Sequence, residues 1–269
     1  MNKVSQILNT CSINSNCALI PFLTAGYPSI DLSIKALFVL DSYGADIIEL
    51  GIPYSDALAD GPLIQNSSKV ALEHGIRIDE VLSILQTVSS KLTAPIIIFS
   101  YYNPILVRGI DKFVMEISLA GAKGLIIPDL PIEETDYLVY LCGIYDIELI
   151  LFIAPTSSYD RISIILSKSP GCLYLVSSTG VTGIRSKIDF SINKLSSYIK
   201  SQTDKSIMLG FGISNTIQAS QASQSNIDGI VIGSAFINIL SNPYLDYKGI
   251  LDALGIFCLN IKSVITSKK

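Results

Sequence analysis

Apolar residues along this chain follow two alternating patterns. Short continuous apolar runs with no polar alternation are typical of strands buried on both faces. Between them, apolar residues recur every three or four positions, which indicates helices with one buried face. The predicted strands span residues 18–23, 46–50, 95–100, 124–127, 148–153, 172–177, 207–209 and 229–232.

Predicted helices separate these strands, and a short one precedes the first. They span residues 4–11, 30–41, 63–74, 79–91, 111–120, 133–142, 159–167, 190–200 and 214–224, with helical segments from 235 onward. The third strand runs into residues 101–104, and the next predicted helix begins at 111. Eight strand–helix units without a linker predict an α/β fold, a (β/α)8 TIM barrel forming a single domain over residues 1–269. A doubly wound open sheet is the alternative, but the turn at 23–27 is not the GxGxxG turn typical of that fold.

Composition limits the cell compartments and the kinds of binding partner that fit this chain. The 269 residues are 49% apolar and 16% charged, with a net charge of −4 and a mean hydropathy of +0.49. The uncharged stretch 4–30 is interrupted by Asn, Ser, Gly and Pro, and it predicts neither a membrane span nor a targeting segment. Five cysteines without CxxC spacing favour a reducing compartment. We expect a soluble protein of the bacterial cytoplasm or the plastid stroma, without nucleic-acid binding.

Two carboxylates of the segment DIIELGIPYSDALADGP, Glu49 and Asp60, are candidates for catalysis. Glu49 lies within the second predicted strand, where a charged carboxylate is costly to bury. Asp60 follows in the loop that leaves this strand. A lone Glu can simply form a salt bridge, and a Gly/Pro/Asp loop can be only a turn. Because active sites of barrels lie at the carboxyl ends of the strands, however, this pair predicts acid/base catalysis.

Small residues form turns after the last three predicted strands. These turns are 180–183, 210–212 and 233–234. Glycines let the backbone approach a ligand closely, and barrels hold phosphate groups in this region. The last two turns contain no Lys or Arg, so the pattern predicts a phosphate site built from backbone N–H groups and the Ser234 hydroxyl.

Apolar and aromatic residues stand at the ends of several predicted strands. Each one can be a simple core residue, but together they predict a flat apolar slot beside the phosphate site. They are Phe22, Phe99, Tyr101, Ile126, Ile153, Tyr174 and Phe211.

The residue types that are missing narrow the reaction further. His74 is the single histidine, which leaves too few ligands for a His-based metal site. Lys123 and Lys205 precede their strands instead of following them, which argues against a Schiff-base aldolase. The sequence therefore predicts acid/base chemistry on a phosphorylated substrate, without a cofactor or a metal in this chain.

The motifs, taken in order, resemble one family. IELGIPYSDALADGP, with PFLTAGYP before it and YYNPI, IIPDLP, STGVTG, GFGIS and VIGSA after it, closely resembles the tryptophan synthase alpha chain over residues 19–236. This resemblance implies a lyase subunit of tryptophan biosynthesis that cleaves indole-3-glycerol phosphate to indole and glyceraldehyde 3-phosphate by a retro-aldol step.

The resemblance also assigns roles to residues. Glu49 would move the proton at the indole C3 and the side-chain hydroxyl, and Asp60 would polarise the indole N–H. The residues that would bind the phosphate are Gly183, Gly212, Gly233 and Ser234. Those that would line the indole slot are Phe22, Ile126, Ile153 and Tyr174. Thr182 would anchor the sixth loop, which closes over the substrate.

A partner follows from the same resemblance. Family members assemble with a beta chain as α2β2, and that chain condenses indole with L-serine to L-tryptophan using pyridoxal phosphate. Ala57 stands where the family usually has proline, so we expect a more flexible loop around Asp60 and altered docking of the beta chain.

Two other functions are compatible with parts of the pattern. A different barrel isomerase acting on a phosphorylated intermediate would use the same phosphate site. A regulatory subunit with a degraded site would have lost its catalytic carboxylates, and the presence of Glu49 and Asp60 argues against it.

Overall fold

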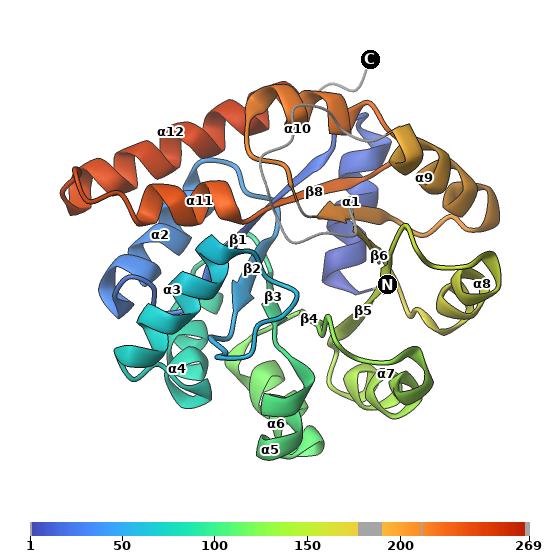
Figure 1. Ribbon diagram of the computed structural model, residues 1–269, viewed down its shortest axis with the longest axis horizontal. Coiled ribbons are helices and arrows are strands. Elements are labelled where there is room, and N and C mark those ends of the chain that lie inside the picture. The colour runs from blue at the N-terminus through green and yellow to red at the C-terminus, as the bar shows by residue number, and fades with distance from the viewer. Residues whose placement is uncertain (1, 177–189, 211, 267–269) are drawn as a thin grey trace.

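The eight predicted strands form one closed parallel barrel in this computed structural model, which describes residues 2–176, 190–210 and 212–266. Figure 1 shows the strands in the centre and most helices around them. The strands are β1 (Ala18–Thr24), β2 (Ile48–Gly51), β3 (Ile96–Phe99), β4 (Gly124–Ile126), β5 (Glu148–Ile153), β6 (Leu173–Val176), β7 (Ile207–Gly210) and β8 (Gly229–Ile232). Pairing of β1 with β8 closes the ring, which confirms the TIM barrel and excludes the open sheet.

Helices connect successive strands. They are α1 (Lys3–Ile13), α2 (Ile30–Ser42), α3 (Pro62–Glu73), α4 (Ile78–Ser89), α5 (Tyr102–Arg108), α6 (Ile110–Ala120), α7 (Thr135–Ile144), α8 (Tyr159–Lys168), α9 (Phe190–Gln202), α10 (Thr216–Ser223), α11 (Ser234–Leu240) and α12 (Tyr247–Ile265), with a 3₁₀ turn at Ile132–Glu134. Several begin at a polar cap, and Ser29, Ser158 and Asn215 each accept a backbone N–H of the first turn.

One helix is missing from the sequence prediction. No helix is predicted between β3 and residue 111, but Asn103 and Pro104 lie in the first turn of α5. Proline is tolerated there because the N–H groups of the first turn have no partner within the helix. Residues typical of a turn are therefore also residues that can begin a helix.

The strand register decides which side chains enter the barrel. Phe22 of β1 pairs with Glu49 of β2, and Glu49 pairs with Ile97 of β3. Paired residues of neighbouring strands project to the same face of a sheet. Glu49 and Phe22 therefore project to the same face of the sheet, which is the inner face of the barrel.

Helix α1 packs against the amino-terminal ends of the strands. Leu8 of this helix packs on Gly229 at the start of β8, where a β-carbon would come within 2.9 Å of the leucine side chain. Glu148 at the start of β5 accepts hydrogen bonds from the Ser5 hydroxyl at 2.5 Å and the Cys172 N–H at 2.6 Å. This buried glutamate lies at the amino-terminal face of the barrel, where residues contribute to stability and not to catalysis. We therefore assign it a structural role.

None of the helices in the described part of the chain has the length and apolar character that crossing a bilayer would require.

Candidate active site

A cavity of about 240 Å³ lies at the carboxyl ends of the strands and contains both predicted carboxyl groups. Its walls come from strand ends, the loop after β2 and the start of α3, and the segments after β7 and β8. The lining residues are Phe22, Glu49, Asp60, Pro62, Leu63, Ile64, Phe99, Tyr174, Gly212, Ile213, Ser214, Val231, Gly233 and Ser234.

Glu49 is a buried acid of strand β2. Its side chain is only 1% exposed, and among the described residues no hydrogen-bond partner meets its Oε1 atom. Burial raises the pKa of Glu49 to about 8, and the nearby charge of Asp60 adds to the rise. Near neutral pH, this carboxyl group is therefore mostly protonated and can act as a general acid.

Asp60 lies in a more polar environment. Its side chain is 5% exposed, and Oδ2 accepts a 3.0 Å hydrogen bond from the Tyr101 hydroxyl. Burial raises the pKa of Asp60 to about 6, although the Tyr101 hydrogen bond opposes this rise. At neutral pH one carboxyl group of the cavity is thus neutral and the other charged, which is the arrangement that assigns an acid and an anion to two similar groups.

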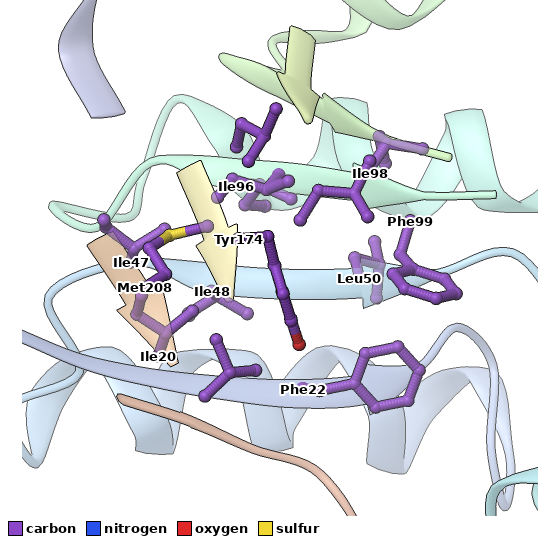
Figure 2. Packing of buried hydrophobic residues seen from close by; sticks show 14 of the residues in the cluster. Ile20, Phe22, Ile47, Ile48, Leu50, Ile96, Ile98, Phe99, Tyr174 and Met208 are labelled. Carbon is purple, nitrogen blue, oxygen red and sulfur yellow. The ribbon is translucent and has the colours of Figure 1, made fainter. Parts of the chain in front are cut away.

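Aromatic rings form the apolar wall of the cavity. The rings of Phe22 and Phe99 meet edge to face with centroids 5.6 Å apart. Figure 2 shows these two rings next to each other and the Tyr174 ring reaching into the same interior. A flat apolar ligand fits such a wall, because aromatic rings prefer edge-to-face and offset contacts.

Two glycines and two serines, Gly212, Gly233, Ser214 and Ser234, form the polar part of the lining. Gly212 has a φ of +89°, a conformation that favours glycine. Gly233 lies so close to Phe22 and Ile64 that a β-carbon would come within 3.3 Å of both. Ser214 donates to the Gln218 side chain through its N–H at 2.8 Å and its hydroxyl at 3.1 Å. Within the described lining no Lys or Arg is present, so an anion here would meet backbone and hydroxyl groups.

Three predicted pocket residues have other surroundings. Tyr101 does not line the cavity but hydrogen-bonds Asp60, which does. Ile126 and Ile153 are fully buried and are also absent from the described lining.

The end of β5 turns a different residue toward the cavity wall. Phe152 pairs with Tyr174 of β6, and their ring centroids are 4.6 Å apart. Ile153 pairs with Leu175, one position further, so it faces the other side of the sheet. The resemblance to the family named Ile153, whereas the register brings its neighbour Phe152 to the inner face. Side chains alternate between the two faces along a strand, and this alternation could have identified Phe152 from the sequence.

Three further predicted residues, Thr182, Gly183 and Phe211, lie outside the described residues.

Sequence reasoning missed part of the apolar lining. Leu63 and Ile64 belong to the first turn of α3, and Ile213 and Val231 come from the segments around β7 and β8. In the sequence these residues look like ordinary helix and strand positions. Only the closure of the barrel brings them together, so no local pattern distinguishes them from core residues.

The fold and the cavity define a class of protein. This is a TIM-barrel enzyme that has, in one cavity, two carboxyl groups with separated pKa values, an apolar slot and a polar end with no lysine in its described lining. Among the described residues, no group of His, Cys, Asp and Glu side chains is arranged to hold a metal ion.

Comparisons with known proteins identify the family within this class. The family model "Tryptophan synthase alpha chain" matches residues 8–265. The tryptophan synthase alpha chain of Gracilaria tenuistipitata var. liui is 62% identical over 97% of this chain and 96% of its own length, and that of Synechocystis sp. is 46% identical over 99% and 100%. The crystal structure of tryptophan synthase subunit alpha from Legionella pneumophila is 33% identical, with a TM-score of 0.89 over 98% of both chains.

The chain belongs to the tryptophan synthase alpha chain family. The resemblance of its motifs is thereby confirmed. This family is the alpha subunit of tryptophan synthase, a lyase-type enzyme subunit that cleaves indole-3-glycerol phosphate, so the predicted enzyme class and pathway are confirmed as well.

Proposed function

We propose that the cavity binds indole-3-glycerol phosphate and that Glu49 and Asp60 break the bond between the indole ring and the glycerol phosphate chain. The observation that carries this proposal is the pairing of a neutral and a charged carboxyl group in one cavity. Their pKa values of about 8 and about 6 lie on either side of neutral pH. A retro-aldol cleavage needs one group that gives a proton and one that stabilises the resulting positive charge.

The steps follow from these protonation states. Neutral Glu49 donates its proton to C3 of the indole ring, and positive charge develops at the indole nitrogen. Charged Asp60 accepts a hydrogen bond from the indole N–H and stabilises that charge. The Glu49 carboxylate then takes the proton of the side-chain hydroxyl. The electron pair of the breaking C–C bond returns to the ring, which releases indole and glyceraldehyde 3-phosphate and leaves Glu49 protonated.

The two other parts of the substrate match the remaining lining. The indole ring would lie against Phe22, Phe99 and Tyr174, which form the aromatic wall. The phosphate would meet the backbone at Gly212 and Gly233 and the Ser234 hydroxyl. Three further residues of the proposed site lie outside the described residues. In this proposal Gly183 binds the phosphate, Thr182 anchors the loop that closes over the substrate, and Phe211 belongs to the apolar slot. Ile126 and Ile153 would support the wall from the barrel core without contact with the substrate, a role that Phe152 shares at the inner face.

A beta chain is the partner that the family implies, and we propose that it docks over the loop after β2 in an α2β2 assembly. The tip of this loop bears Leu58, whose side chain is 84% exposed and apolar. The adjacent Ala57 is 3% exposed, and its carbonyl accepts hydrogen bonds from the Asp60 N–H and the Gln65 side chain. Pyridoxal phosphate would belong to the beta chain, and this chain would use no cofactor.

Restoring the family's proline at position 57 tests the role of this loop. No hydrogen bond among the described residues uses the Ala57 N–H, so proline removes no donor there. Fixing the backbone lowers the conformational entropy that docking must remove, by about 0.4–1 kcal/mol. We expect Ala57→Pro to tighten beta-chain binding roughly two- to fivefold by titration calorimetry. Unchanged or weaker binding would contradict this account of the loop.

The relatives of this chain bear on its location. They include proteins of red algae and of cyanobacteria, which supports a plastid stroma or a bacterial cytoplasm.

An indole-release assay tests the proposed function. The purified chain is incubated with indole-3-glycerol phosphate, with and without a beta chain, and the mass of the mixture is measured in parallel. Indole and glyceraldehyde 3-phosphate should appear in equal amounts, faster with the beta chain, and the mass should correspond to α2β2. Phosphorylated product without free indole would favour the isomerase alternative, and activation of the beta chain without any cleavage would favour the regulatory one.

A further inference from the structure

Tyr101 connects the end of β3 to the loop that carries Asp60. It caps α5 just after β3, and it is 4% exposed. Its hydroxyl oxygen accepts a 3.0 Å hydrogen bond from the Ala59 N–H and donates one of 3.0 Å to Asp60 Oδ2. A hydroxyl group has one proton, so a Tyr101 oxygen that already accepts from Ala59 directs its proton at Asp60.

The ring of Tyr101 is fixed from two sides. It packs on Tyr54, at the other end of the same loop, with centroids 5.2 Å apart. It also meets Phe99 of the cavity wall edge to face, with centroids 6.1 Å apart. A side chain whose ring is held by packing presents its hydroxyl in one direction, which is how supporting residues fix the geometry of a catalytic group.

The other hydrogen bonds of this loop, among the residues that the structure describes, do not reach the Asp60 carboxyl group. The Gln65 side chain donates to the carbonyl oxygens of Ala57 and Asp60, at 3.1 Å and 3.0 Å. Gln65 therefore holds the backbone of the loop, whereas Tyr101 holds the carboxyl group itself. This division matters in a chain that has Ala57 in place of the family's proline, because no fixed backbone angle at that position stiffens the loop.

We propose that Tyr101 is the positioning residue for Asp60: its hydroxyl aims the carboxyl group at the substrate and keeps it ionised at neutral pH. This inference rests on the proposed function of Asp60. With Oδ2 engaged by Tyr101, Oδ1 is the oxygen that receives the indole N–H. A hydrogen bond donated to a carboxylate favours the charged form, so the bond serves both geometry and ionisation.

The charged and titratable groups around Asp60 are consistent with this role. Glu49 is mostly neutral near pH 7, and Tyr174 and Tyr101 face Asp60 with pKa values that are raised, chiefly by burial. Both hydroxyl groups therefore keep their protons throughout the working range. Asp129 also acts on Tyr101 and raises its pKa further. Of these groups, Tyr101 is the one whose hydrogen bond lowers the pKa of Asp60.

The test is Tyr101→Phe in the full chain, which retains the ring contacts and removes the hydroxyl. We expect kcat/KM for indole release to fall about 10- to 100-fold, the scale of one hydrogen bond to a charged group. The acidic limb of the pH profile should move to higher pH, because Asp60 loses the bond that favours its charge. Titration of the Asp60 carboxyl carbon by 13C NMR should show the same upward movement without substrate.

Two controls separate positioning from a general structural role. Tyr54→Phe removes a hydroxyl of the same loop that accepts a hydrogen bond from the Asn103 side chain and donates none to Asp60 among the described residues. The activity should therefore stay within about twofold of wild type, and the acidic limb should not move. In an Asp60→Asn background, adding Tyr101→Phe should lower kcat/KM by less than about a further twofold, because both changes act through the Asp60 carboxyl group.

Two results would overturn the inference. One is an unmoved acidic limb with an unmoved Asp60 titration in Tyr101→Phe, and the other is an equal loss of rate in the wild-type and Asp60→Asn backgrounds. Failure of the proposed function would look different, because the wild-type chain itself would then release no indole.

Discussion

Glu49→Gln abolishes indole release while substrate affinity stays within about tenfold of wild type. Glutamine has nearly the shape of the glutamic acid, so the packing of the inner face that Glu49 shares with Phe22 and Ile97 is kept. It has no proton to give to C3 and cannot take one from the substrate hydroxyl. Removing an acid/base group typically lowers the rate by about 10² to 10⁴. Steady-state kinetics measure the rate, and calorimetry with the substrate under non-reacting conditions measures the affinity.

The barrel offers a matched control for this variant. Glu148 is also a buried strand glutamate, 2% exposed, but it lies at the opposite ends of the strands and bonds Ser5 and Cys172. Glu148→Gln should lower the free energy of unfolding by about 1–3 kcal/mol, because these donors lose a charged acceptor. Its kcat at a temperature where it is folded should stay within about threefold of wild type. Wild-type turnover in Glu49→Gln, or an equal loss in both variants, would contradict the assignment.

Asp60→Asn lowers kcat/KM by about 10² to 10³, the second largest effect that we expect. Asparagine can still accept the indole N–H, but it carries no charge to stabilise the positive ring. A second consequence follows from the proximity of the two carboxyl groups. The charge of Asp60 contributes to the raised pKa of Glu49, so its removal should move the basic limb of the pH profile to lower pH.

The exposed neighbour Asp56 provides the control for this prediction. It lies in the same loop and pairs with the Ser55 hydroxyl at 3.1 Å. In the isolated chain, Asp56→Asn should leave both the rate and the pH profile unchanged. An Asp60→Asn enzyme whose basic limb does not move would show that the two carboxyl groups are not coupled in one cavity.

The barrel could be predicted from the sequence because its strands are buried on both faces. The run IIIF that forms β3 has no polar alternation and is flanked by turn residues, which is typical of a strand covered by helices. The pair Glu49 and Asp60 could be predicted for a related reason, since a carboxylate within an apolar strand is costly unless it has a use.

The details that sequence reasoning misses depend on tertiary structure. Ile153 and Phe152 are neighbours of similar character, and only pairing with β6 decides which of them faces inward. Tyr101 resembles one more wall residue, because no local pattern shows that a loop folds back onto its hydroxyl. Glu148 is buried like Glu49, but its partner Ser5 lies 143 residues away, so no local pattern reveals its structural role.

The dependence of kcat/KM for indole release on pH tests the central claim most directly. The active form has Asp60 charged and Glu49 neutral, so activity is lost below the pKa of Asp60 and above that of Glu49. The account predicts a bell with limbs near pH 6 and pH 8, which belong to the coupled pair. A wild-type profile that stays flat from about pH 5 to about pH 9, a range that brackets both groups, would contradict it.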